Sequence, residues 1–286
     1  ERTLAEPVRL VYDKEISSQT LRVLMKKLLI DSSDSLIPGG RYHHRRDYMN
    51  FPRLNRPDLH YKKLNPLTIK GLSLKSSIIK AIDSKDYLIN TPYHTFSYVI
   101  KFLRESALDP DVKSIKITIY RLSKISNVVS SLINAARNGK KVLVQIELQA
   151  RFDEENNIRV AEILKLAGVE LIFGVKGLKV HSKICLIERR ENNSMKFYGF
   201  ISTGNFNEST AKVYTDYTLF TSNQSILKDV SKVFEFLKVN YKIQTYKHLI
   251  VSPHYTSSIL FSLIDNEIEN SINGKKSQII LKLNSL

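Results

Sequence analysis

His181 and Lys183 stand two residues apart in a segment whose composition predicts a β-strand. Alternate residues of a strand point to the same face, so we expect the imidazole and the ammonium group to lie side by side. An imidazole nitrogen can accept a phosphoryl group, and a fixed positive charge stabilises the phosphate oxygens during transfer. A structural core histidine is the alternative, but the neighbouring lysine favours a site that handles phosphate.

A small polar turn, Ser-Thr-Gly-Asn-Phe-Asn at residues 202–207, follows this segment. Glycine and asparagine residues in such turns present backbone N–H groups and side-chain amides to anions. Asn205 and Asn207 are therefore candidates for phosphate binding beside His181 and Lys183.

Two arginines follow neighbouring predicted strands. Arg121 comes at the end of the strand 114–120, and Arg151 comes just after the strand 141–148. Ligands of open α/β sheets bind at the carboxyl ends of the strands, and guanidinium groups bind phosphate oxygens in pairs. A single arginine at such a place is more often part of a surface ion pair, but two at equivalent places favour a phosphate site.

Three acidic residues, 153–155, follow Arg151 directly. Acidic side chains are favourable at a helix N-terminus, which would make them purely structural. One of them could instead order Arg151 or contact a magnesium ion. The spacing does not decide between these interpretations.

Strand and helix patterns alternate from residue 75 onward, which predicts an α/β fold with a parallel or mixed sheet flanked by helices. Residues 53–70 are rich in Pro, Asn and Lys and are interpreted as a connection between domains. The last strand-helix-strand pattern looks like the beginning of a further domain. The expected strands are 8–12, 86–90, 114–120, 141–148, 169–174, one through His181, 196–201, 216–221, 248–252 and 278–283, and the main helices are 94–108, 128–138, 156–166, 224–239 and 257–272.

The composition points to polyanionic partners. Forty-four Lys and Arg against 28 Asp and Glu give the 286-residue chain a net charge of +16, which suits nucleic acid, nucleotides, inorganic polyanions or an anionic membrane surface, with a solvated basic surface as the alternative. Trp is absent and no run interleaves aromatic with basic residues, so no nucleic acid is expected as a partner. A basic cluster at 41–47 contains His43 and His44, for which a solvated loop is preferred to an anion-binding or subunit-contact loop.

The same composition bears on the cellular setting. No run of eighteen apolar residues predicts a transmembrane helix, and the first residues lack the apolar core of a signal peptide. The single cysteine, Cys185, cannot form an internal disulfide, which favours a reducing, cytoplasmic setting. The chain lacks an initiator Met, so we expect a cut piece or a processed form.

The H-x-K pair, an acid at Glu188 after four intervening residues, and the polar turn resemble half of a phospholipase D superfamily site, although the usual acid is Asp. More specifically, the chain resembles the polyphosphate kinase family over nearly its whole length. The matching segments are residues 40–43, 109–112, 117–121, 147–158, 178–183, 203–207 and 214–216.

This resemblance implies reversible transfer of the terminal phosphate of ATP to polyphosphate through a phosphohistidine at His181. Tyr214 would contact the nucleotide, and Arg121 and Arg151 would occupy the family's magnesium–phosphate position. Arginine carries only donors, so we expect these two side chains to hold phosphate oxygens while Mg2+ enters with ATP or ADP.

The resemblance also implies a phospholipase D-like sheet and a division into three parts. Residues 1–68 would end a middle domain associated with dimerisation, 69–248 would form the first catalytic domain, and 249–286 would begin the second. The parent protein would be a cytoplasmic homo-oligomer, with peripheral association at the inner membrane face as an option.

One departure from the family concerns completeness. The family needs a second histidine from the last domain, and this chain has one H-x-K motif. We therefore expect half an active site that is inactive alone. A phospholipase D-like phosphodiesterase and a non-catalytic polyanion-binding module are the alternative functions.

Overall fold

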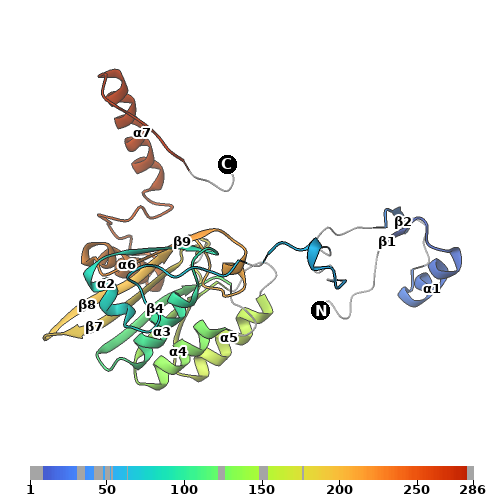
Figure 1. Cartoon of the computed structure of the whole chain (residues 1–286), viewed down its shortest axis with the longest axis horizontal. Coiled ribbons are helices and arrows are strands. Elements are labelled where there is room, and N and C mark those ends of the chain that lie inside the picture. The colour runs from blue at the N-terminus through green and yellow to red at the C-terminus, as the bar shows by residue number, and fades with distance from the viewer. Residues whose placement is uncertain are drawn as a thin grey trace. The chain divides into compact units, whose positions relative to one another are not determined.

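The computed structural model describes residues 9–30, 36–41, 48, 52, 54–62, 64–121, 126–147, 154–175 and 177–281 (Figure 1). The chain divides into two compact units, residues 1–64 and 65–286. This border falls close to the predicted border after residue 68, but the assignment of three domains stays a prediction. Arg151 and the pair His43–His44 lie outside the described residues.

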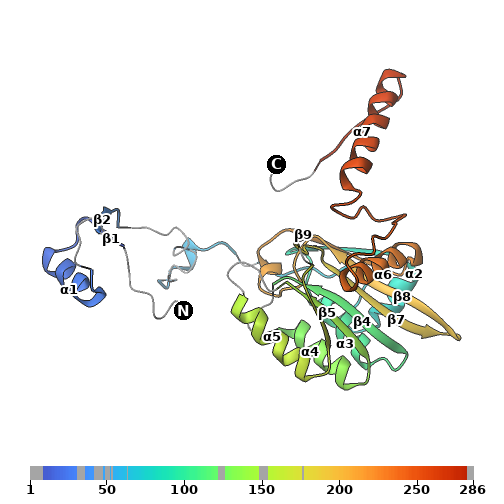
Figure 2. The ribbon, with the colours of Figure 1, turned by 180° about the vertical axis from the view of Figure 1, so that it is seen from behind.

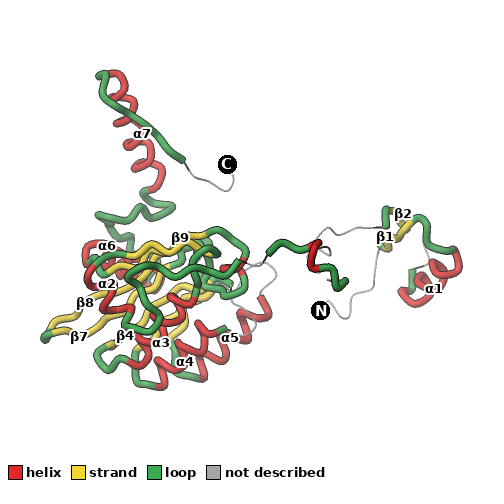
Figure 3. Tube along the Cα trace, in the orientation of Figure 1, coloured by secondary structure: helices red, strands yellow, loops and turns green. Residues whose placement is uncertain are grey.

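The first unit contains a small parallel strand pair joined by a helix (Figure 3). The hydroxyl of Ser17 accepts a hydrogen bond from the backbone N–H of Thr20 (3.1 Å), which caps the helix. The elements are β1 (Leu10–Asp13), α1 (Ser18–Leu28), β2 (Leu36–Gly39) and the 3₁₀ turn η4 (Pro57–Leu59).

The second unit is built on a sheet that has, within the described residues, seven strands in the order β3-β9-β8-β7-β4-β5-β6. The pairs β4–β5 and β5–β6 are parallel, and the other pairs are antiparallel. The prediction of an α/β fold with a mixed sheet is therefore confirmed. The strands are β3 (Tyr87–Thr91), β4 (Val112–Ile119), β5 (Lys141–Ile146), β6 (Glu170–Phe173), β7 (Ile184–Glu191), β8 (Ser194–Ser202) and β9 (Asp216–Thr221).

Helices cover both faces of this sheet. Figure 2 shows α4 and α5 on one side of the strands and α6 on the other. Two separate hydrophobic clusters form, one under α2 to α5 and one under α6. The helices are α2 (Ile78–Ser84), α3 (Ser97–Leu108), α4 (Asn127–Arg137), α5 (Glu154–Leu166), α6 (Gln224–Lys238) and α7 (Thr256–Ile272), with a 3₁₀ turn η5 (Thr210–Lys212) before β9.

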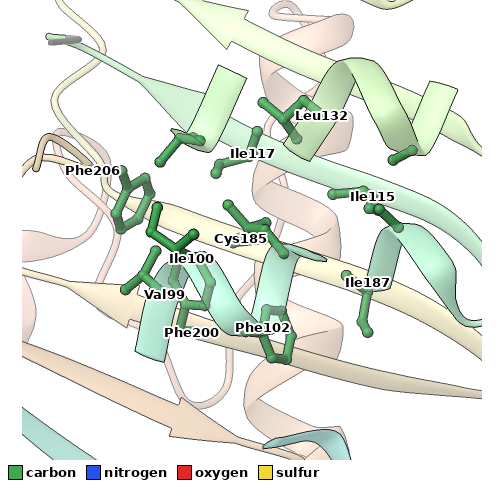
Figure 4. Packing of buried hydrophobic residues seen from close by; sticks show 14 of the residues in the cluster. Val99, Ile100, Phe102, Ile115, Ile117, Leu132, Cys185, Ile187, Phe200 and Phe206 are labelled. Carbon is green, nitrogen blue, oxygen red and sulfur yellow. The ribbon is translucent and has the colours of Figure 1, made fainter. Parts of the chain in front are cut away.

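Strand β7 divides its side chains between the two clusters. Cys185 and Ile187 belong to the first cluster, and Ile184 and Leu186 belong to the second, as the two-residue repeat of a strand requires. Figure 4 shows Cys185 and Ile187 packed on the first side. Burial raises the pKa of the Cys185 thiol, so this residue is an inert part of the core.

Two predicted strands are wrong. Residues 248–252 form turns and irregular backbone, and the described part of the last segment, 278–281, is irregular as well. Their backbone N–H groups have side-chain partners instead. The carboxylate of Asp229 accepts from residues 247–249, and Glu267 accepts from the N–H of Gln278 (2.9 Å).

Gly199 in β8 has no room for a side chain, because a Cβ there would lie 2.2 Å from the backbone oxygen of Cys185 on β7. We expect Gly199→Ala to lower the free energy of unfolding by about 3 kcal/mol, since the neighbouring strand cannot move away without losing its ladder. Urea denaturation would measure the change. Gly40→Ala, where a Cβ has no atom within 4 Å, serves as the control and should leave stability unchanged; an unaltered Gly199→Ala midpoint would contradict the packing argument.

Candidate active site

His181 and Lys183 lie in the loop that leads into β7, not in the strand itself, which begins at Ile184. The prediction that the two side chains share one strand face is therefore wrong. His181 is exposed, whereas Lys183 is buried. The ammonium group of Lys183 turns back and donates a hydrogen bond to the carbonyl of His181, which fixes the loop in this shape.

The backbone of this loop is attached to the sheet on both sides. The buried hydroxyl of Thr118 on β4 donates to the carbonyl of Ser182 (2.8 Å) and accepts from the N–H of Ile184 (3.1 Å). On the other side, the carbonyl of Lys183 accepts from the N–H of Ser202 on β8 (2.8 Å). These bonds place His181 at the junction of the parallel and the antiparallel halves of the sheet.

The ring of Tyr120, directly after β4, lies at the centre of the charged groups. The imidazole of His181 packs against it in a T-shaped arrangement, with the ring centroids 5.1 Å apart and the planes at 83°. Three cations surround the same ring. The ammonium groups of Lys183 and Lys179 lie 5.3 and 5.6 Å from its centroid, and the guanidinium carbon of Arg121 lies 6.0 Å away.

Arg121 and His181 thus both lie beside the ring of Tyr120. The parallel pairing of β4 with β5 also confirms that Arg121 and Arg151 follow neighbouring strands. Arg151 itself lies outside the described residues, so its place relative to His181 stays a prediction.

Asn157 connects the two strand ends and was missed as a site residue. It lies inside α5, fully buried. Its side-chain N–H group donates to the carbonyl of Tyr120 (3.0 Å) and to that of Glu147 (2.9 Å). A polar residue one turn into a helix that follows a strand end is the signal that could have revealed it.

The polar turn at 202–207 packs tightly against the start of β9. The hydroxyl of Thr203 donates to a carboxylate oxygen of Asp216 (2.8 Å). A Cβ on Gly204 would lie 2.4 Å from that same carboxylate group, so glycine is required by the close approach. The start of β9 therefore brings an acidic side chain, that of Asp216, toward Lys183.

The predicted ligands of this region have different surroundings. Asn207 is buried, and its side-chain oxygen accepts from the N–H groups of Ser209 (2.9 Å) and Thr210 (3.1 Å). The side-chain oxygen of Asn205 is buried and has no partner among the described residues. Tyr214 is 63% exposed and available to a ligand. Contact of these three residues with phosphate or nucleotide stays a prediction.

Glu188, which the resemblance placed at the acid position of the H-x-K motif, lies further along β7. Its carboxylate forms an ion pair with Lys116 of β4 (2.7 Å), and the two residues before it in the strand face the core. The carboxylate that acts electrostatically on Lys183 is instead that of Asp216.

The electrostatics of the loop favour a neutral imidazole. Partial burial and the positive charges of Lys183 and Lys179 lower the pKa of His181 below its ordinary value. Burial lowers the pKa of Lys183 to about 8, although the charge of Asp216 opposes this. At neutral pH, His181 therefore offers an unprotonated nitrogen beside ammonium groups that are still mostly charged.

A cavity of about 620 Å³ opens beside the loop. His181, Lys183 and Thr203 are among the polar residues that line it, together with side chains of α6 and of residues 249–253. His181 thus lines a space large enough for a ligand.

Protein carboxylates offer little to a metal ion here. Among the described residues, no group of three or more His, Cys, Asp or Glu side chains could hold one. Arg121, assigned to the magnesium–phosphate position, is a donor only. The described residues therefore fit phosphate oxygens and do not by themselves form a magnesium site.

An exposed histidine and three cations around one tyrosine ring, at the end of the parallel strands of a mixed sheet, form an arrangement in an α/β protein that suits a phosphate ligand. Residues 77–243 match the family model described as "Polyphosphate kinase C-terminal domain 1". The chain is 44% identical to the polyphosphate kinase of Vibrio parahaemolyticus and 45% identical to that of Escherichia coli K12; both matches span all of this chain and cover 41% and 42% of those proteins.

The crystal structure of polyphosphate kinase from Porphyromonas gingivalis matches with a TM-score of 0.75 and 36% identity, covering 96% of this chain and 44% of that one. The chain belongs to the polyphosphate kinase family, which confirms the resemblance drawn from the motifs. It spans less than half the length of these relatives. Within the described residues, no helix is long and apolar enough to cross a membrane.

Proposed function

We propose that this chain provides the phosphate-accepting half of a polyphosphate kinase, which transfers the terminal phosphate of ATP reversibly to polyphosphate. The observation that supports this most strongly is the exposed imidazole of His181, with a lowered pKa, packed against the ring of Tyr120, around which three cations gather. A neutral imidazole is the nucleophilic form, and nearby positive charge stabilises the oxygens of the phosphoryl group during transfer.

The transfer has two steps. In the first, the unprotonated nitrogen of His181 forms a bond to the terminal phosphorus of ATP, while the bond to the bridging oxygen breaks and ADP leaves with the electron pair. In the second, a terminal oxygen of polyphosphate attacks the same phosphorus and the imidazole leaves. Lys183 and Arg121 would hold the oxygens of the phosphoryl group, and Arg151 would join them from the neighbouring strand end.

The remaining assignments follow from family membership and from the geometry. Tyr214 would contact the nucleotide, and Asn205 and Asn207 would hold the turn against the phosphates. Magnesium would enter with ATP or ADP, and we assign no step to it. We also propose a homo-oligomeric, cytoplasmic protein whose net charge of +16 suits polyphosphate and the inner membrane surface rather than nucleic acid.

The proposal is tested by incubating the full-length protein with γ-labelled ATP and then treating it with acid or alkali. A label that is stable in alkali and lost in acid is expected, because a phosphoramidate bond has this stability. Absence of label together with cleavage of a phosphodiester substrate would show a phosphodiesterase. Salt-dependent binding of polyphosphate without label or cleavage would show a non-catalytic polyanion-binding module.

The pH dependence of labelling gives a further prediction. The pKa of Lys183, about 8, means that its positive charge is lost as the pH rises through 8, so kcat/KM should fall there. Because Asp216 raises this pKa, Asp216→Asn should move the alkaline limb to lower pH and reduce kcat/KM at pH 8 about fivefold. On the acid side, the lowered pKa of His181 should keep labelling high down to pH 6.5.

Glu188→Gln is the matched control for Asp216→Asn, since it removes a carboxylate that is paired with Lys116 instead. Its pH profile should match the wild type. If instead Glu188→Gln moves the alkaline limb and Asp216→Asn does not, the carboxylate that acts on Lys183 is that of Glu188, as the motif implies.

A further inference from the structure

The ring of Tyr120 lies against the charged groups of the site. It meets the side chains of His181, Lys179, Lys183 and Arg121. Each of these contacts involves the ring, so the aromatic face and edge matter here more than the hydroxyl.

The backbone around Tyr120 is held firmly. Its carbonyl accepts from the buried side chain of Asn157 (3.0 Å), and Thr118, two residues earlier on β4, binds the loop of His181 on either side of Lys183. The end of β4 therefore fixes both the backbone of the loop, through Thr118, and the side chains that extend from it, through Tyr120.

Like charges in such a cluster repel one another, so something must keep them together before phosphate binds. Within the described part of the chain, neither Lys179 nor Lys183 forms an ion pair within 4 Å, although Asp216 acts on Lys183 from a greater distance and Lys183 donates to the carbonyl of His181. The face of an aromatic ring attracts a cation by about 0.5–2 kcal/mol, the more so when water is partly excluded. An aromatic pair in a T-shaped arrangement also restricts the rotation of its partner.

We propose that Tyr120 is a positioning residue whose ring orients the imidazole of His181 and gathers the three cations around the place of the transferred phosphate. This inference rests on the proposed function, since it concerns the same site. The ring keeps the cations together in the absence of substrate, so that binding of phosphate needs little rearrangement. The phenol hydroxyl takes no part.

The test compares three substitutions. Tyr120→Phe and Tyr120→Trp keep an aromatic ring, whereas Tyr120→Leu keeps apolar volume without one. In the full-length protein, Tyr120→Leu should slow phosphohistidine formation from ATP about 30-fold, mainly in kcat, while the aromatic variants stay within about twofold of wild type. Rescue by the two aromatic variants is an outcome that general loss of packing would not produce.

A second measurement does not depend on ATP. Inorganic tripolyphosphate should bind Tyr120→Leu about tenfold more weakly than Tyr120→Phe, and the NMR signals of the His181 imidazole should shift in Tyr120→Leu but hardly in Tyr120→Phe. Urea denaturation identifies any variant that does not fold. If Tyr120→Leu does not fold, the comparison of Tyr120→Phe with Tyr120→Trp remains, and Tyr120→Trp is expected to be labelled at least as fast.

The outcomes separate the two proposals. If the wild type forms no phosphohistidine, the proposed function is wrong, and binding of tripolyphosphate with the NMR shifts still decides the role of the ring. If the wild type is labelled but Tyr120→Leu is labelled equally fast, or Tyr120→Phe loses as much as Tyr120→Leu, the positioning role of the ring is overturned.

Discussion

His181→Gln should abolish the acid-labile label that the wild-type protein acquires from ATP, a loss of more than about 1,000-fold. Glutamine keeps a polar side chain of similar length but has no nitrogen that can form a stable bond to phosphorus. The side chain is exposed, and the loop is held by backbone bonds to Thr118 and Ser202. The variant should therefore fold normally and still bind tripolyphosphate.

The matched control is His248→Gln, which changes another exposed histidine in the same unit. The backbone N–H of His248 is bound by Asp229, and glutamine keeps that bond, so labelling should equal the wild type. Mass spectrometry of the labelled protein under alkaline conditions would locate the phosphate. Label retained in His181→Gln, or found on another residue, would refute the role of His181 as phosphate acceptor.

Asp229→Ala should lower the free energy of unfolding by about 4 kcal/mol, because it removes the buried carboxylate that attaches the segment 247–249 to α6. Asp229 is 2% exposed. One of its oxygens accepts from the N–H groups of Lys247 (2.8 Å), His248 (2.7 Å) and Leu249 (3.3 Å). Without it, three backbone donors lose their partner at once.

Urea denaturation and hydrogen exchange of these three amides would measure the effect. Asp229→Asn is the control, since it keeps an acceptor without the charge and should lose roughly half as much. Faster exchange confined to 247–249 and the neighbouring wall of the cavity is expected. Exchange that stays slow in Asp229→Ala would show that apolar packing alone holds the segment.

The pH dependence of this effect has a definite sign. Burial by itself raises the pKa of Asp229, but the hydrogen bonds from residues 247–249 and from Lys232 outweigh it, so that the pKa lies below its ordinary value. A carboxyl group with a lowered pKa stabilises the fold above its unfolded pKa, near 4, and loses this contribution as the pH falls through its folded value. The difference between wild type and Asp229→Ala should therefore shrink below about pH 4.

Regular elements with strong periodicity could be predicted from the sequence, because burial on one face leaves a repeating pattern. The strand 216–221 and the helix over 224–239 agree with β9 and α6 to within one residue. The predicted strand 248–252 is wrong because the apolar pattern of a segment does not show which groups bind its backbone. A carboxylate far along the chain, Asp229, takes the N–H groups that a strand would use for pairing.

The site was predicted in composition but not in geometry. His181, Lys183 and Arg121 do come together, yet the shared strand face does not exist, because the strand begins only at Ile184. Tyr120 was read as the last residue of a strand, and nothing in its spacing shows that four side chains surround its ring. Such contacts arise from the pairing of β4 with β7, which brings together residues that are far apart in sequence.

The antiparallel pairing of β7 with β8 could have been predicted from the residues that join them. Asn192 and Asn193 both have positive φ angles, 44° and 64°, and they join β7 to β8 as a tight hairpin. Asparagine tolerates this backbone region better than most residues. Two adjacent asparagines between strand patterns therefore predict an antiparallel pair.

The buried Cys185 has a practical consequence for spectroscopy. It is the one cysteine in the chain, and its thiol is inaccessible and resistant to ionisation. A cysteine introduced by Ser194→Cys at the exposed start of β8 would then react selectively with a maleimide dye. The dye would sit beyond the far end of β7 from His181, roughly 25 Å along the strand, a suitable separation for energy transfer to a fluorescent nucleotide.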